Sequence, residues 1–198
     1  MIIRSFLVSL GLIILSIQPG FAFDYISRSS KQEFFDSKQN FFMAHVNPAV
    51  MKAIKEAIKE DPNDPERYLQ RGLAYNHLQK YDKAIDDFTH VIELDPNNVD
   101  AYNFRGTMYF RLGQYDKALA DYNKAIKIDP EYALLYFNRG YVKAELGNIE
   151  SAIADFEKGA SLAKEQGNLN TYQQAQNVIE KLKVSPESIS PGSGNNYH

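Results

Sequence analysis

The apolar and small residues between positions 99 and 130 follow the three- and four-residue spacing of amphipathic helices. One stretch carries them on a single face: Tyr102, Gly106, Tyr109 and Leu112. A second stretch does the same: Ala118, Leu119, Tyr122, Ala125, Ile126 and Ile128. Gly113 separates the two, because glycine adopts the left-handed backbone that ends a helix. Pro130 follows the second stretch and cannot continue the helical hydrogen bonds. The pattern predicts a pair consisting of a first and a second helix.

This pair is one of three copies at a constant spacing along the chain. The spacing equals the separation of Tyr68 and Tyr102 along the sequence, and we call it the repeat period. Shifting the chain by one repeat period superimposes the sets Tyr68, Tyr102 and Tyr136; Gly72, Gly106 and Gly140; Leu78, Leu112 and Leu146; Ala84, Ala118 and Ala152. We predict repeats at residues 65–98, 99–132 and 133–166. One pair cannot bury its apolar face alone, so pairs must stack. The sequence therefore predicts an all-α fold, an α-solenoid of stacked antiparallel helix pairs.

The unit resembles the tetratricopeptide repeat (TPR) family. The family pattern is an aromatic residue, a Leu-Gly pair, a Tyr, an Ala, an aromatic, a small residue and a Pro. In the second repeat these positions hold Tyr102, Gly106, Tyr109, Ala118, Tyr122, Ala125 and Pro130, with arginine in place of the family's leucine. The first repeat departs at Val91, where the family prefers Ala. The third departs at Lys143, Gly159 and Lys164, so we expect its second helix to end differently. The resemblance implies a TPR superhelix.

Both flanks of the repeats carry helical patterns of their own. Residues 48–64 form a half repeat with a lone second helix, in which Ile54, Ala57 and Ile58 stand where the first repeat has Phe88, Val91 and Ile92. Residues 30–44 supply the missing first helix in degenerate form. They belong to a phenylalanine-rich segment, 23–47, that we interpret as a cap on the solenoid; contact with a partner or a membrane is the alternative.

The C-terminal flank predicts a helix followed by a tail. Residues 168–183 place Tyr172, Ala175, Ile179 and Leu182 on one stripe with polar residues elsewhere. Such a helix closes the last stack of a solenoid, so we predict a capping helix. Residues 184–198 are rich in Ser, Pro, Gly and Asn and predict a disordered tail.

Residues 1–22 predict a cleaved signal peptide. Arg4 gives a basic start, an apolar stretch runs from Phe6 to Ile17, and Gly20 and Ala22 are the small residues before a cleavage site. A membrane-spanning anchor, the alternative, needs about 20 apolar residues, and this stretch is shorter. We predict export, to a bacterial periplasm first and by secretion second, without stable membrane insertion after cleavage.

Composition removes several classes of function. A net charge of −3 offers no basic face for nucleic acid. The absence of cysteine excludes disulfides and thiolate metal sites. No histidine pair has metal-ligand spacing, and neither a phosphate-binding glycine loop nor a Gly-x-Ser-x-Gly elbow occurs. We predict a non-enzymatic protein with no cofactor and no metal.

The resemblance implies that the first helices line a concave face on which a protein or peptide binds. The candidate positions are Leu69, Leu73, Asn76, His77, Asn103, Thr107, Phe110, Arg111, Phe137 and Tyr141. Their mixture of aromatic, aliphatic and amide side chains is typical of a peptide groove. The alternative is that some of them pack against the flanking segments.

One subgroup of the family clamps a C-terminal carboxylate with Lys, Asn and Arg on these helices. The corresponding positions here are Leu69, Leu73, Phe104, Leu134 and Asn138. The required charges are missing, so the sequence predicts no capture of that type.

A charged pair recurs in every repeat. Arg71, Arg105 and Arg139 are followed sixteen residues later, on the partner helix, by Asp87, Asp121 and Asp155. We name these six residues the Arg–Asp ladder. A bidentate Arg–carboxylate pair orients two helices, so we favour a structural role over an anion-binding stripe.

These observations favour an exported scaffold that binds a protein or peptide, and the resemblance implies a role in the assembly or regulation of bacterial envelope complexes. Two alternatives remain: a secreted protein that contacts a host partner, and a structural repeat domain that forms a homodimer.

Overall fold

The computed structural model describes residues 47–184. Its helices are α2 (Pro48–Glu60), α3 (Pro65–His77), α4 (Tyr81–Leu94), α5 (Val99–Arg111), α6 (Tyr115–Ile128), α7 (Ala133–Glu145), α8 (Ile149–Glu165) and α9 (Leu169–Val184). Within 47–184 there is no strand, and the prediction of an all-α solenoid is confirmed. The predicted signal peptide, nearly all of the phenylalanine-rich segment and the tail from residue 185 lie outside the described residues.

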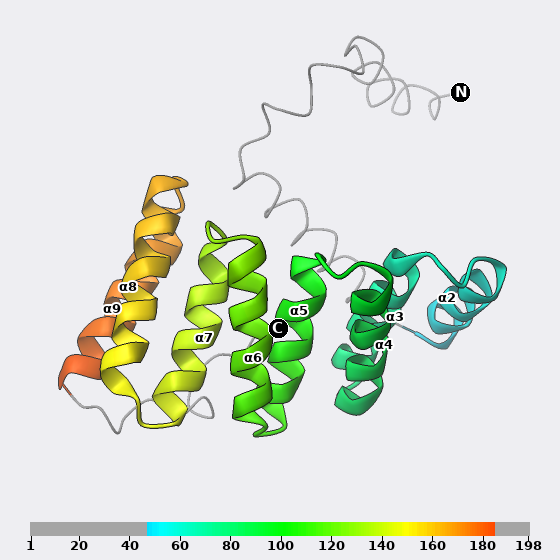
Figure 1. Ribbon diagram of the computed structural model, residues 1–198, viewed down its shortest axis with the longest axis horizontal. Coiled ribbons are helices and arrows are strands. Elements are labelled where there is room, and N and C mark those ends of the chain that lie inside the picture. The colour runs from blue at the N-terminus through cyan, green and yellow to red at the C-terminus, as the bar shows by residue number, and fades with distance from the viewer. Residues whose placement is uncertain (1–46, 185–198) are drawn as a thin grey trace, which may run out of the picture.

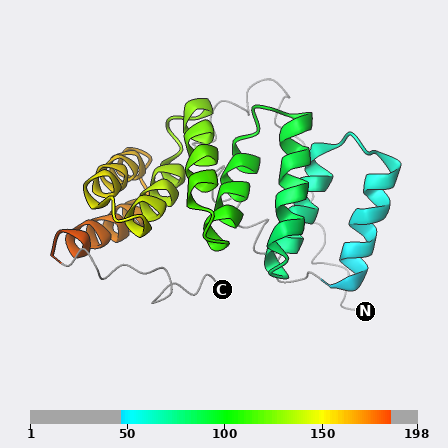
Figure 2. The same cartoon turned by 60° about the horizontal axis from the view of Figure 1, so that its bottom comes forward.

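The helices follow one another in a row, from α2 at one end to α9 at the other (Figure 1). The most extensive contacts are those within the pairs α3–α4, α5–α6 and α7–α8. Each second helix also packs on the next first helix, α4 on α5 and α6 on α7, so neighbouring pairs form one continuous stack (Figure 2). This arrangement is that of a solenoid whose repeats contact their neighbours.

A left-handed residue closes the first helix of every repeat. Gly113 and Gly147 have φ angles of 70° and 78°, and Gln79 holds the equivalent position with φ of 55°. At Gly113 the amide donates to the carbonyl of Phe110 at 2.9 Å, and the next amide, of Gln114, donates to Tyr109 at 2.8 Å. These bonds satisfy carbonyls at the end of the helix and turn the chain back along it.

Aspartate and proline make the turn between repeats. The side chain of Asp95 accepts from the amide of Asn97 at 3.0 Å, and Asp129 accepts from the amide of Glu131 at 3.1 Å. The proline that follows each aspartate cannot donate a helical hydrogen bond, so the second helix ends there.

The core pairs a glycine on each first helix with a ring on its second helix. A Cβ atom on Gly72 would lie 2.6 Å from the ring of Phe88, and one on Gly106 would lie 3.0 Å from the ring of Tyr122. Real Cβ atoms do not pack as closely as 2.6 Å, so glycine is required at position 72, and at position 106 a larger residue would force the Tyr122 ring to shift. Both rings are almost fully buried.

The last second helix ends differently from the others, as its sequence predicts. α8 has 17 residues, whereas α4 and α6 have 14, and Lys164 stands where those repeats have proline. The turn after α8 uses Gly167, with φ of 79°, as the turns inside the pairs do. α9 then buries Ala175, Ile179 and Leu182 against the third repeat.

Among residues 47–184 no helix combines the length and the apolar character that crossing a bilayer requires.

Candidate protein-interaction surface

The Arg–Asp ladder forms as three bidentate pairs, each joining the two helices of one repeat. Arg71 Nε and Nη2 donate to Asp87 at 2.9 and 2.7 Å. The corresponding distances are 2.8 and 2.8 Å for Arg105 with Asp121. They are 2.8 and 2.6 Å for Arg139 with Asp155. All three carboxylates are buried, so the guanidinium groups are their charge partners inside the stack.

Two of the arginines also reach back to the preceding repeat. Arg105 Nη1 donates to the hydroxyl of Thr89 at 3.1 Å, and Arg139 Nη1 donates to the amide oxygen of Asn123 at 2.7 Å. Thr89 and Asn123 hold the same position, one repeat period apart, on α4 and α6. These two arginines therefore connect three helices each, within a repeat and across its boundary.

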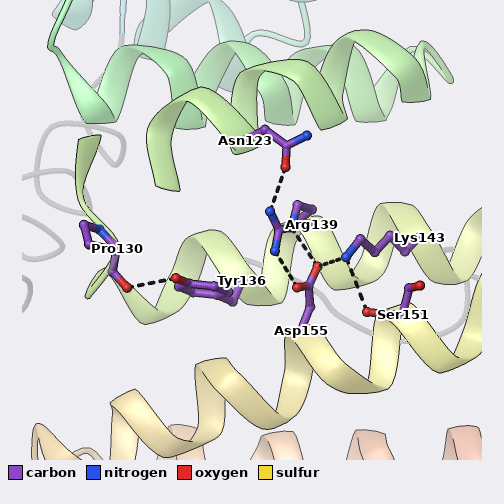
Figure 3. A network of polar contacts seen from close by, with 7 residues as sticks. All are labelled: Asn123, Pro130, Tyr136, Arg139, Lys143, Ser151 and Asp155. Atoms are coloured by element: carbon purple, nitrogen blue, oxygen red, sulfur yellow. Dashed lines mark hydrogen bonds and ion pairs between the residues drawn. The ribbon is translucent and has the colours of Figure 1, made fainter. Parts of the chain in front are cut away.

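The third repeat adds a second cation to its aspartate (Figure 3). Lys143 Nζ lies 2.7 Å from Asp155 Oδ2 and 3.4 Å from the carbonyl of Ser151. The equivalent residues in the first two repeats are Tyr75 and Tyr109, each with a lysine near its ring. Lys143, which departs from the family pattern, therefore adds a second ion pair to the ladder.

The pKa shifts of the ladder residues agree with a structural role for the Arg–Asp ladder. The hydrogen bonds that each arginine donates to its aspartate raise the pKa of Arg71, Arg105 and Arg139 above the ordinary value, so the guanidinium groups stay charged. Burial raises the pKa of Asp87, and the hydrogen bonds from Arg71 oppose that rise. Because each guanidinium fork is already occupied by a carboxylate, little of its charge is left for an external anion.

The structure corrects four of the ten predicted inward positions. Leu69, Leu73, Asn103 and Phe137 are between 2% and 8% exposed. The two leucines belong to a core cluster with Phe88 and other side chains of α4 and α5. They therefore hold the repeats together and offer no surface to a partner.

Phe137 is buried for a local reason. A Cβ atom on Gly159 would lie 2.6 Å from the Phe137 ring, which occupies the space that a larger residue on α8 would take. The ring also stacks on Phe156, with centroids 6.3 Å apart. Phe137 thus packs within its own repeat.

Asn103 is buried, and its side-chain oxygen is satisfied there by another amide. Asn138 on α7 donates to its side-chain oxygen at 2.8 Å. The bond connects α5 with α7, two first helices that also contact each other directly. The first helices therefore lie next to one another on this side of the stack.

The other six predicted positions keep part of their surface. Three lie at the C-terminal ends of the first helices α3 and α5, where His77 and Arg111 are exposed and Phe110 is half-buried beside Tyr115. Arg111 lies over the ring of Tyr81 at 5.7 Å and donates to its hydroxyl at 3.4 Å. The remaining three are half-buried: Asn76, Thr107 and Tyr141. We name these six residues the inward row.

Two members of the inward row are held in place by the core. Thr107 donates to the carbonyl of Asn103 at 2.9 Å and shares a 3.1 Å hydrogen bond with the Tyr122 hydroxyl. Tyr141 meets the Phe156 ring edge-on, with centroids 4.9 Å apart. Their side chains are fixed by neighbours, which lowers the entropy lost when a partner binds.

The sequence interpretation missed Asn138, Tyr81, Thr89 and Asn123 as partners of residues that it had named. A signal for the last two was available: both lie sixteen residues before a ladder arginine. Asn138 and Tyr81 had no such signal, because their contacts arise from how neighbouring pairs pack.

Residues 47–184 hold no group of three or more histidine and carboxylate side chains placed to bind a metal. The histidines in this range are His77 on α3 and His90 on α4, and His90 has an acidic neighbour, Glu93, at 3.2 Å.

Family comparisons agree on the repeat. Models of the tetratricopeptide repeat match residues 65–98, 88–120 and 133–166, and a TPR repeat model matches 106–147. Together they span residues 65–166, slightly more than half of the chain. The ranges 65–98 and 133–166 coincide with the predicted first and third repeats. No curated protein is similar enough to the chain to count as a relative.

Solved structures share the fold. The TPR2B-domain:pHsp70 complex of yeast Sti1 is 21% identical over 60% of this chain and 95% of that one, with a TM-score of 0.58. MamA is 21% identical over 80% and 98%, with a TM-score of 0.54. The first TPR of Spaghetti (RPAP3), bound to the HSP90 peptide SRMEEVD, is 27% identical over 61% and 96%, with a TM-score of 0.51.

Proposed function

We propose that this chain is a non-enzymatic scaffold that binds a protein or peptide. Residues 65–166 make it a tetratricopeptide-repeat protein. The partner lies along the first helices α3, α5 and α7 and contacts the inward row. Two similar structures, the TPR2B domain of Sti1 in complex with pHsp70 and the first TPR of Spaghetti with an HSP90 peptide, hold such ligands, which supports the general kind of function.

The observation that carries the proposal is the contrast between recurring and varying positions. The three repeats keep the same arginine, glycine and aspartate in the frame. At equivalent inward positions they differ: Asn76, Phe110 and Ala144 in one set, and His77, Arg111 and Glu145 in the next. All six keep part of their surface, so their variation gives each repeat different side chains to present to a partner.

Phe110, Arg111 and Tyr141 are the residues we assign the largest share of binding. Aromatic and arginine side chains dominate the energetics of protein interfaces. Arg111 is exposed while its contact with Tyr81 orients it across the boundary between repeats one and two. The proposed partner segment therefore presents an apolar group to the rings and an acceptor to the guanidinium.

Site-specific photo-cross-linking in the native cells tests the proposal. A photoreactive phenylalanine analogue replaces Phe110 in one variant and Lys124, which is exposed on the second helix α6, in the control. We expect position 110 to give a discrete protein adduct that position 124 does not give, and Tyr141→Ala to reduce it. Equal adducts from both positions would show that the first-helix side is not the binding side.

Export is a separate proposal, supported by the basic start, the apolar stretch and the small residues of segment 1–22. A TPR scaffold exported to a bacterial periplasm is placed to serve envelope complexes. N-terminal sequencing of the protein from fractionated cells should give Phe23 as the first residue, in the periplasmic fraction. Recovery of the uncleaved chain from the cytosol would rule export out, and recovery from the medium would favour secretion.

A further inference from the structure

One helix of the stack lacks a neighbour that its equivalents have. The second helices α4 and α6 each pack between two first helices, their own and the next. Among the described helices, α2 makes extensive contacts with α3 alone. The flank of α2 on which its own first helix would lie is therefore open in residues 47–184.

The register of α2 identifies that flank. Ile54 and Ile58 are buried and lie one repeat period before Phe88 and Ile92. Asp61 caps the helix end and accepts a hydrogen bond from the amide of Asn63, as Asp95 accepts one from the amide of Asn97. α2 is thus a second helix in the same register as α4, and the missing first helix corresponds to residues 31–43.

Residues 31–43 carry aromatics where a first helix contacts its own partner. Phe34 and Phe41 lie one repeat period before Tyr68 and Tyr75. The Tyr68 ring lies 4.1 Å from the ring of His90 on α4. The ring of Tyr75 lies 5.7 Å from Lys83 Nζ on the same helix.

The segment is polar where a first helix would contact a preceding repeat. Two positions of α5 and α7 are fully buried against the repeat before: Ala101 and Leu135, and Met108 and Val142. The equivalent residues in the segment are Glu33 and Asn40. A terminal pair has no preceding repeat, so polar residues suit these positions.

Four further differences from the first repeat occur as two compatible pairs. The ladder residues are absent together, because Ser37 and Ala53 replace the arginine and the aspartate. Lys38 replaces the glycine that the Phe88 ring requires at Gly72, and Ile54 replaces that ring. In a helix pair of this register no aromatic ring would lie opposite position 38, so a residue with a Cβ would fit there.

We propose that residues 31–43 form the first helix of a terminal pair and cover the open flank of α2. The occupant of this face is the chain itself, held by Phe34 and Phe41. The pair closes the N-terminal end of the stack as α9 closes the other.

A disulfide tests this placement, since the chain has no cysteine of its own. In the second repeat a Cβ atom on Gly106 would lie 3.3 Å from the Cβ of Asp121, close to the separation that a disulfide spans. The equivalent residues are Lys38 and Ala53, so the test variant is Lys38→Cys with Ala53→Cys. The control is Gln39→Cys with Ala53→Cys, which moves one cysteine about 100° around the proposed helix.

Under mild oxidation of the full chain, we expect the 38–53 pair to close within one chain at least ten times faster than the 39–53 pair. Equal rates would overturn the proposal. A disulfide between two chains would assign the flank to a second copy and overturn it as well. Neither outcome bears on partner binding at the inward row, which photo-cross-linking tests separately.

Discussion

Gln79 is the one residue other than glycine with a left-handed backbone among those described. A side chain there costs about 1–2 kcal/mol relative to the right-handed region, and the greater freedom of glycine in the unfolded chain offsets part of the gain. We expect Gln79→Gly to raise the free energy of unfolding by about 0.5–1 kcal/mol and Gly113→Ala to lower it by about 1 kcal/mol. Urea unfolding followed by circular dichroism measures both free energies. A lower free energy of unfolding for Gln79→Gly would show that the backbone of Gln79 is not strained.

Tyr122 links stability to alkaline pH. Burial raises the pKa of its hydroxyl well above the ordinary value of about 10, and the hydrogen bond with Thr107 opposes this only in part. The folded state thus favours the protonated form. Its contribution is complete below pH 10 and falls as the pH rises further, because only the unfolded chain ionises there.

The variant Tyr122→Phe isolates this contribution. At pH 8 we expect it to lower the free energy of unfolding by about 0.5–1.5 kcal/mol through loss of the Thr107 bond. At pH 11 the deficit relative to the parent chain should be smaller, because the parent alone carries the ionisation cost. Urea titrations at both pH values provide the measurement, and a deficit that grows with pH would show that Tyr122 ionises easily in the fold.

At the scale of single residues, the sequence predicted which side chains contact each other better than it predicted which side chains are exposed. The ladder spacing of sixteen residues predicts which charges lie on partner helices, because helical geometry fixes both positions. The burial of Phe137 depends on which residue lies opposite it. Gly159, a departure from the family's alanine, was visible in the sequence, and its missing side chain makes the space that the Phe137 ring fills.

The helix pair, as an element, depends on its ladder bond. Asp121→Ala leaves the half-buried Arg105 without its carboxylate, and we expect a loss of about 2–4 kcal/mol in the free energy of unfolding. Arg105→Leu combined with Asp121→Ala removes both charges and restores the leucine typical of the family. Thermal and urea unfolding should show the double variant more stable than Asp121→Ala alone. If the losses simply add, the pair contributes little to the packing of α5 on α6.

α9 is the element that covers the end of the third repeat. Its Ile179 and Leu182 belong to the same core cluster as Phe156 and Leu162 of α8. A chain ending at Gly167 exposes that cluster, and we expect it to associate or precipitate where a chain ending at Val184 remains monodisperse. Analytical ultracentrifugation distinguishes the two, and a monodisperse short chain would show that α9 is dispensable.

Element boundaries followed from local chemistry. Glycine and proline fix the backbone within a residue or two, so the capping helix expected at 168–183 is observed at Leu169–Val184. The type of turn before it was less evident, although Gly167-Asn168 repeats Gly147-Asn148. That turn joins α8 to α9 in the way that a first helix joins its second.

For the whole molecule, the binding of one peptide tests whether the ligand is a C-terminal carboxylate. The heptapeptide SRMEEVD is bound by the similar repeat domain of Spaghetti. Here Leu69 and Leu73 are buried, and Leu134 is apolar where a clamp for a terminal carboxylate needs charge. We expect isothermal titration calorimetry to give no saturable binding of SRMEEVD. Saturable binding that is lost when the terminal carboxylate is amidated would contradict this.

The bonds that Arg105 and Arg139 make to the preceding repeat bear on how the array can change in length. The receiving positions on α2, α4, α6 and α8 are Lys55, Thr89, Asn123 and Glu157. Thr89 and Asn123 accept a hydrogen bond and carry no charge, whereas Lys55 can only donate, and Arg71 bonds to Asp87 alone. A tandem duplication of residues 99–132 would set the new Arg105 against Asn123. Duplication of the first repeat would likewise set a new Arg71 against Thr89, and duplication of the third would set a new Arg139 against Glu157. Each repeat can thus be copied without placing its arginine against a cation such as Lys55.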